Sequence, residues 1–196
     1  MGAKQAVPKW SDVKKRLQSF GPPEFLELVC EMFKLSVENQ TFLVARLLKG
    51  TVGTSLLEPY RRRIEQAFYS RNGWPQGKIQ LGAARKVIRD YQKATGDLTG
   101  TIELMMVFVE TGTAFTRNFG DIDAPFYDSL TSVLDEIKRL VTSKEARGLY
   151  DHFRQRLLVL VEMAAPIGWG YGDYVGGTVR ALECRQPDTA RRRNRT

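Results

Sequence analysis

Histidine and cysteine are nearly absent from this sequence of 196 residues. The chain contains one histidine, His152, and two cysteines, Cys30 and Cys184, which lie far apart. Three such residues at wide spacing cannot form the tetrahedral Cys and His ligand sets of zinc sites. A hydrolase with a serine or cysteine nucleophile would have to use His152 as its base. Because His152 lies beside Phe153 of an apolar stripe, we expect it on the surface or in a groove.

Long apolar runs are also missing. The first ten residues, MGAKQAVPKW, contain no apolar core of the length found in signal peptides. The nearest approach to a membrane span, LLVLVEMAAPI, is short and carries Glu162. Cys30 lies in an apolar helical run, where a free thiol acts as a small hydrophobe. The sequence therefore predicts a cytoplasmic protein with no membrane partner.

The glycine loops that bind nucleotides are absent as well. The segment GWPQGKI (73–79) has three residues between its glycines where a Walker A loop needs four, and Ile79 replaces the required Ser or Thr. The segment GWGYGDYVGG (168–177) fails the GxGxxG pattern in both frames, because Asp173 or Val175 falls where the third glycine belongs. We therefore expect no cofactor.

The positive charge is unevenly distributed along the chain. The formal net charge is +8, from 30 basic and 22 acidic residues. Residues 185–196 hold five arginines against Asp188, so this short segment carries half of the net charge. Its composition predicts a disordered arginine-rich tail. We expect a flexible N-terminus over residues 1–10 and one helical domain over residues 11–184.

Helical periodicity dominates the predicted domain. Apolar residues recur at the i, i+3, i+4 and i+7 spacing in most segments, and no segment alternates convincingly as a strand does. Glycine and proline clusters separate the helical segments by short connections, which favour antiparallel neighbours. The sequence therefore predicts an all-α fold, a single-domain antiparallel bundle of seven or eight helices.

One segment, residues 97–118, is apolar nearly all round and is expected at the centre of the fold. A narrow polar stripe crosses it and includes Glu103 and Glu110. Since a buried carboxylate must be paired or protonated, we expect arginines or hydroxyls from neighbouring helices to pair with these two acids. The segments PYRRRIEQ (59–66) and DHFRQRL (151–157) could supply them. The alternative is a pocket or metal site lined by both carboxylates.

The aromatic and glycine-rich segment 168–177 has two interpretations. In the first, it stops one helix, turns the chain and starts a last short helix with Asp173 as the N-cap, while Trp169 and Tyr171 cover the helices. In the second, Trp169, Tyr171, Asp173 and Tyr174 form a lip that binds a partner. The sequence leaves both open.

The segment FGDIDAP (119–125) also has two interpretations. Asp123, followed by Ala and Pro, is typical of an N-cap with proline in the first helical turn. Asp121 and Asp123 could instead bind a divalent cation through oxygens. Together with Glu103 and Glu110 they are the weak candidates for metal ligands, and we expect no metal.

Basic clusters carry a second functional hypothesis. Arginines beside aromatic residues can hold phosphates and stack on bases. The candidates for such contacts are Arg61, Arg62 and Arg63 near Tyr60, and Arg191, Arg192 and Arg193 in the tail. No recognisable nucleic-acid-binding motif accompanies them.

Four segments resemble an uncharacterised family of bacterial all-helical proteins, a domain of unknown function. They are LSVENQTFLVARL (35–47), EPYRRRIEQAFY (58–69), ETGTAFTRNFGDIDAPFYDSL (110–130) and GWGYGDY (168–174). The resemblance implies an all-α fold and a bacterial cytoplasm, and it carries no catalytic residues.

Three functional hypotheses follow. The first is a non-catalytic protein-interaction module that uses a helical groove or the lip at Trp169. The alternative is a nucleic-acid-associated protein that binds through its basic patches. The third is a metal-assisted hydrolase built on the acidic candidates.

Overall fold

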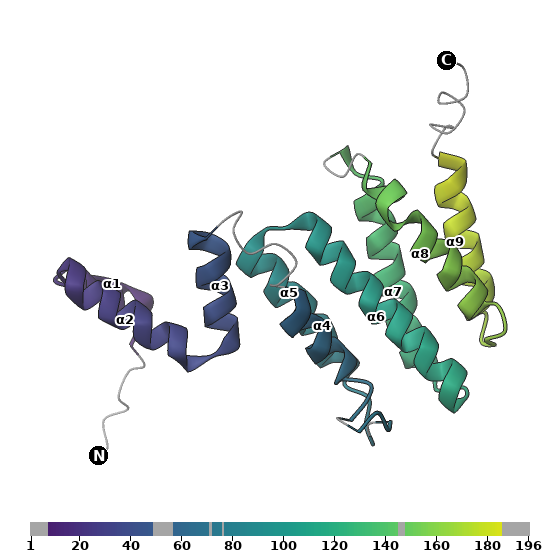
Figure 1. Cartoon of the computed structure of the whole chain (residues 1–196), viewed down its shortest axis with the longest axis horizontal. Coiled ribbons are helices and arrows are strands. Elements are labelled where there is room, and N and C mark those ends of the chain that lie inside the picture. Colours follow the sequence, from purple (N-terminus) through teal and green to yellow (C-terminus); the bar gives the residue numbers. More distant parts are fainter. Residues whose placement is uncertain (1–7, 49–56, 71, 76, 145–147, 186–196) are drawn as a thin grey trace, which may run out of the picture. The chain divides into compact units, whose positions relative to one another are not determined.

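The computed structural model describes residues 8–48, 57–70, 72–75, 77–144 and 148–185, and these residues form nine α-helices (Figure 1). The helices are α1 (Trp10–Leu17), α2 (Pro22–Leu35), α3 (Val37–Leu47), α4 (Leu57–Glu65), α5 (Leu81–Thr95), α6 (Leu98–Phe119), α7 (Ala124–Val141), α8 (Leu149–Ala164) and α9 (Tyr171–Arg185). The described residues contain no β-strand, only an isolated bridge between Tyr69 and Pro75. The predicted all-α class is therefore confirmed, with more helices than the seven or eight expected.

The chain divides into two units, residues 1–52 and residues 53–196. The predicted single domain over residues 11–184 stays a prediction. Of the predicted tail, Arg185 still belongs to α9, and the remaining residues lie outside the described part of the chain. No helix in the described ranges combines the length and apolar character that a membrane crossing requires.

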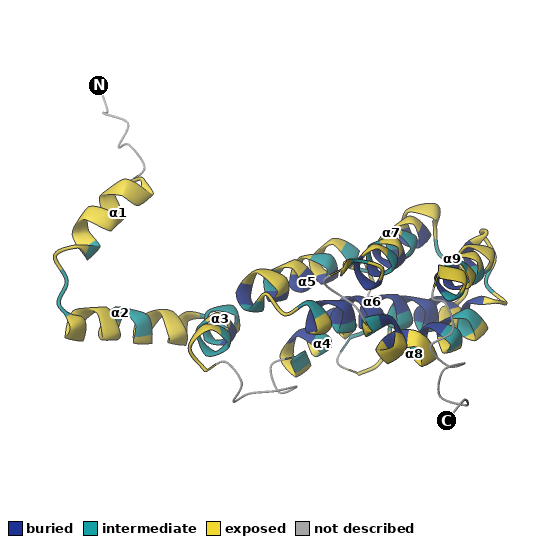
Figure 2. Cartoon of the chain, turned by 90° about the horizontal axis from the view of Figure 1, so that it is seen from above, coloured by how far each residue is buried: buried dark blue, intermediate teal, exposed yellow. Residues whose placement is uncertain are grey.

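The first unit contains α1, α2 and α3 and has almost no interior of its own. The side chain of Ser36 accepts a hydrogen bond from the backbone N–H of Asn39 (3.1 Å) and caps α3. Thr41 is the one buried residue among residues 8–48. Figure 2 shows α1 and α2 almost wholly exposed, and large apolar side chains such as Leu26 and Leu35 face outward.

The second unit is built around α6, which contacts α4, α5, α7 and α8 (Figures 1 and 2). Its apolar residues are buried on most sides, with Ile102, Leu104, Met106, Phe108 and Val109 at or near zero exposure. The prediction that residues 97–118 lie at the centre is confirmed within this unit. The helices that surround α6 therefore pack against it, and their polar side chains can reach the polar residues of α6.

Local signals set the boundaries of the later helices, and two differ from the prediction. Asp123 caps α7 by accepting a hydrogen bond from the N–H of Phe126 (3.0 Å), as predicted. Hydrophobic periodicity predicts a long helix over about residues 143–165, but α8 begins at Leu149, where Gly148 adopts a left-handed φ of 85°. The last helix begins at Tyr171, so Asp173 lies inside its first turn and is not the N-cap. An acidic residue in that turn still interacts favourably with the helix dipole.

The turn between α8 and α9 brings two backbones into close approach. A Cβ at Gly172 would lie 2.7 Å from the carbonyl oxygen of Ala164, a distance that real side chains do not tolerate. The absence of a side chain at Gly172 therefore allows α9 to pack against the end of α8. This packing holds the intervening Trp169 and Gly170 at one end of the second unit.

Candidate functional site

A polar network crosses the otherwise apolar surface of α6. Arg156 of α8 grips both carboxylates of α6: its Nε and Nη2 donate to Glu110 (2.8 and 2.7 Å), and its Nη1 donates to both oxygens of Glu103 (2.7 and 2.6 Å). Arg61 of α4 donates to the same Glu103 (2.8 Å). The prediction that arginines from these two segments pair with Glu103 and Glu110 is confirmed.

The network is partly shielded from water, which strengthens it. The side chain of Glu103 is 16% exposed and that of Arg156 is 31% exposed. Burial alone would lower the pKa of Arg156, but the hydrogen bonds to Glu110 and Glu103 outweigh it and hold that pKa above its usual value. Both acids are therefore neutralised by permanent cations and tie α4, α6 and α8 together.

A cavity of about 590 Å³ lies beside this network. Its lining includes Arg61, Glu103 and His152, as well as Tyr91 of α5 and residues at the start of α6. Tyr91 donates a hydrogen bond of 2.7 Å to Asp97, the N-cap of α6. The ring of Phe153 packs edge-on against the imidazole of His152, 4.7 Å between centroids. His152 is exposed and lies in a groove, as the sequence predicts. These side chains could hold a small polar ligand, and they contain no hydroxyl or thiol nucleophile paired with His152 among the described contacts.

The aromatic and glycine-rich segment separates its two leading residues. Trp169 is 62% exposed and has a left-handed φ of 58°, the one non-glycine residue with positive φ in the described ranges. Its indole stacks on the ring of Tyr127, 6.2 Å between centroids and 24° between planes. A bulky residue in this conformation is rare, because its Cβ crowds the backbone. The structure therefore displays Trp169 rather than burying it.

Tyr171, two residues later, belongs to the core. It is 1% exposed, and its hydroxyl shares a hydrogen bond of 2.7 Å with Thr113 of α6. Burial raises the pKa of Tyr171 above its usual value. Tyr127 extends the same polar seam, since its hydroxyl hydrogen-bonds with Thr116 (2.7 Å) and donates to Asp121 (3.0 Å). These hydrogen bonds hold the start of α9, next to Trp169, against α6 and α7.

Tyr174 and Asp173 lie on the open side of α9. Tyr174 is 38% exposed, and its hydroxyl donates to Asp135 of α7 (2.6 Å). This hydrogen bond, with partial burial, raises the pKa of Tyr174 to about 12. Asp173 is exposed. Of the four predicted lip residues, Trp169, Asp173 and Tyr174 thus reach solvent and Tyr171 does not.

The other predicted site residues are engaged elsewhere or lie outside the described residues. Arg61 pairs with Glu103, and Arg62 pairs with Glu58 of its own helix (2.9 Å). Arg63 takes part in an interaction as well. Arg191, Arg192 and Arg193 lie outside the described ranges.

The four weak metal-ligand candidates do not form one group. Glu103 and Glu110 pair with arginine, Asp121 accepts from Tyr127, and Asp123 caps α7. Within the described part of the chain no three His, Cys, Asp or Glu residues are close enough together to hold a metal ion. Each acid has a contact that accounts for it without a metal.

Sequence reasoning missed two residues that shape the lip. Tyr127 supports the indole of Trp169, and Asp135 accepts from Tyr174. Neither residue gave a local signal, because their partners, Trp169 in the turn before α9 and Tyr174 in α9, lie about 40 residues further along the chain. The pairing of aromatic residues in FYD (126–128) and GWGYGDY (168–174) was the one available hint.

Comparisons with known proteins place no constraint on this site. The sequence matches no protein-family model, no curated protein and no solved structure. The resemblance to an uncharacterised bacterial family therefore stays a prediction.

Proposed function

We propose that the chain is a non-catalytic protein-interaction module that binds its partner through the lip formed by Trp169, Asp173 and Tyr174. The observation that carries this proposal is the conformation of Trp169, which is 62% exposed in a left-handed backbone conformation. Strained backbone of this kind costs roughly 1–3 kcal/mol and clusters at functional positions. A turn that served only to reverse the chain would favour glycine at a left-handed position, as at the next residue, Gly170, which has a φ of 70°.

The exposed indole has the properties of an interface anchor. Tryptophan is among the residues that contribute most to binding when a partner buries them. An indole with about 150 Å² of exposed surface gains roughly 4 kcal/mol when that surface leaves water. Stacking on Tyr127 already restricts the ring, so binding sacrifices less side-chain entropy.

The contacts of the acidic residues favour binding over catalysis. The carboxylates of Glu103 and Glu110 are both neutralised by guanidinium groups. A general acid or base needs a pKa poised near the working pH and a proton it can exchange with substrate. Carboxylates held in bidentate ion pairs are poorly suited to that role.

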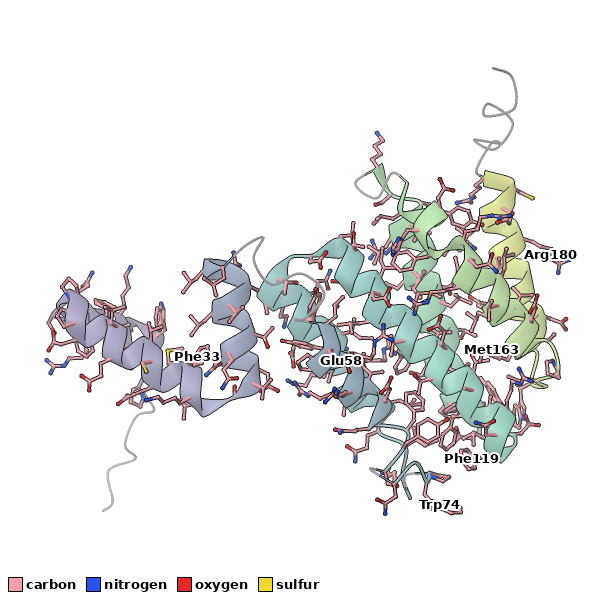
Figure 3. All side chains as sticks on the ribbon, viewed as in Figure 1. Phe33, Glu58, Trp74, Phe119, Met163 and Arg180 are labelled. Carbon is pink, nitrogen blue, oxygen red and sulfur yellow. The ribbon has the colours of Figure 1, made fainter. Side chains whose placement is uncertain are left out.

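A matched pair of tryptophans tests the proposal. Trp74 is 71% exposed and lies on the connection between α4 and α5, away from the turn that carries Trp169 (Figure 3). Affinity capture from a lysate of the source organism, quantified by mass spectrometry, compares the wild type with Trp169→Ala and Trp74→Ala. We expect Trp169→Ala alone to lose a specific captured protein, with its melting temperature within a few degrees of wild type. Equal capture by all three would exclude the lip as the binding site.

The nucleic-acid alternative has a separate signature. Binding through basic patches weakens steeply with salt and does not depend on Trp169. Fluorescence anisotropy with labelled single- and double-stranded nucleic acids, from low to physiological salt, measures this salt dependence directly.

The cytoplasmic location, the bacterial origin and the arrangement as one antiparallel bundle are likewise predictions.

A further inference from the structure

The lip lies in a region of the chain that carries acids and no cations. Residues 118–137 contain five acidic residues and no lysine or arginine, and residues 157–179 contain two acidic residues and no lysine or arginine. The acidic residues are Asp121, Asp123, Asp128, Asp135, Glu136, Glu162 and Asp173. Such a segregation is notable in a chain whose formal net charge is +8.

Contacts join the two segments into one surface. The ring of Tyr127 stacks with Trp169, and its hydroxyl donates to Asp121. Further along α7, Asp135 accepts from Tyr174 of α9 (2.6 Å). We name this surface the acidic-aromatic face and define it by Asp121, Asp128, Asp135, Trp169, Asp173 and Tyr174. All six residues are exposed.

The spacing along α7 gives the face a direction. Asp128 and Asp135 are seven residues apart, so they lie on the same side of the helix, two turns and about 10 Å from one another. Residues three apart in an extended peptide are separated by about the same distance. The cations that flank the two segments in the sequence are Arg117, Lys138, Arg156 and Arg180. Arg156 is paired with Glu103 and Glu110, and Figure 3 shows Arg180 projecting from α9.

We infer that the acidic-aromatic face binds an extended peptide segment rich in arginine or lysine. This inference rests on the proposed function and names the chemistry of its partner. The carboxylates attract cationic side chains and steer the encounter. The outer face of the Trp169 indole is suited to a guanidinium, which gains roughly 0.5–2 kcal/mol from a cation–π contact.

Other occupants fit this surface less well. A nucleic acid would bring phosphates against the four carboxylates of this face. Arg85 of α5, which donates to Ser132 of α7 (3.3 Å), would offset only part of that repulsion. A metal ion needs ligands that converge on one point, and among the described residues no three such groups converge. An extended cationic chain, in contrast, meets separated charges one at a time.

The test uses the full chain and fluorescein-labelled hexa-arginine, with binding followed by anisotropy. We expect saturable binding that weakens as salt rises. Asp128→Asn combined with Asp173→Asn should weaken it at least fivefold, and Trp169→Ala at least threefold. Glu65→Gln combined with Asp151→Asn removes the same charge from other helices and is expected to change the affinity less than twofold.

Three outcomes would overturn the inference. They are no saturable binding of hexa-arginine, an affinity of Trp169→Ala equal to that of the wild type, or a loss of affinity in the control pair equal to that in Asp128→Asn with Asp173→Asn. The third would mean that the peptide follows net charge alone. If hexa-arginine fails while lysate capture still depends on Trp169, the inference is wrong and the proposed function stands. If capture does not depend on Trp169 either, both are wrong.

Discussion

Replacing Arg156 with leucine would remove the cation that joins the two acids of α6. Arg156 donates four hydrogen bonds to Glu103 and Glu110, between 2.6 and 2.8 Å long. In the variant, Glu110 loses the guanidinium that grips both its oxygens, while Glu103 keeps Arg61. Two carboxylates on one face of α6 would then repel each other across a surface with restricted access to water.

The cost follows from the degree of burial. Removing one partner of a buried ion pair costs roughly 3–5 kcal/mol, because the remaining charge is left uncompensated. Glu103 is 16% exposed and Glu110 is 28% exposed, so water recovers part of that loss. We therefore expect a loss of about 2–4 kcal/mol, which lowers the melting temperature by roughly 4–16 °C in a domain of this size.

The assay is chemical denaturation followed by circular dichroism at neutral pH. Arg154→Leu is the matched control, since Arg154 lies on the same helix and pairs bidentately with Glu183 at the surface, with side chains 47% and 34% exposed. Surface pairs contribute little, so this control should lose clearly less stability than Arg156→Leu.

A compensated variant separates charge from packing. Arg156→Leu combined with Glu103→Leu and Glu110→Leu replaces three members of the network with apolar side chains and leaves Arg61, whose side chain is 39% exposed, to water. Replacing buried ion pairs in this way is often neutral or stabilising. We expect this variant to regain most of the loss. If Arg156→Leu is no more destabilising than Arg154→Leu, or if the compensated variant remains as unstable as Arg156→Leu, the reasoning about the network is wrong.

Three further predictions concern the turn and the tyrosines. Gly172→Ala should lower the free energy of unfolding by about 1–3 kcal/mol, because its Cβ would overlap the carbonyl oxygen of Ala164. Gly176→Ala on the same helix would make only an ordinary 4.0 Å contact and should raise that free energy by about 0.5–1 kcal/mol. Equal free energies of unfolding for the two variants would contradict the close approach at Gly172. Trp169→Gly relieves the left-handed strain and removes an exposed ring, so its stability should stay within about 1 kcal/mol of wild type, and a loss above about 3 kcal/mol would mean that the ring belongs to the core. Hydrogen bonding to Asp135 and partial burial raise the pKa of Tyr174 to about 12, above its value in the unfolded chain. The stability that this bond provides is therefore complete below pH 10 and is lost between pH 10 and pH 12. A tyrosinate absorbance titration with no step near pH 12, or with the same curve in Tyr174→Phe as in the wild type, would contradict this prediction.

Much of the fold and the ion-pair network could be predicted from the sequence because the signals are local or chemically forced. Glu103 and Glu110 lie on a helix that is otherwise apolar, so their carboxylates need partners when the helix is buried. Two segments with arginines at helical positions could supply those partners. The cap at Asp123 is equally local, since it involves a backbone N–H three residues away. Hydrophobic periodicity alone was enough for the all-α class.

The lip could not be predicted because its outcome depends on contacts between distant segments. The burial of Tyr171 and the exposure of Trp169 follow from the packing of α9 on α7 and α8, which brings the Tyr171 hydroxyl to Thr113 of α6, with which it shares a hydrogen bond. Asp173 was expected as the N-cap of a helix that begins at Tyr174, but the close approach at Gly172 let the helix start three residues earlier, at Tyr171. No periodicity in a ten-residue turn contains that information.

The most direct test of the central claim is photo-crosslinking at the lip. A photoreactive benzoylphenylalanine replaces Trp169 in one variant and Trp74 in another, and both are irradiated in cells of the source organism. We expect a discrete cross-linked product with another protein from position 169 and none of the same mass from position 74. Absence of any product specific to position 169 would contradict the claim that this tryptophan is displayed for a protein partner.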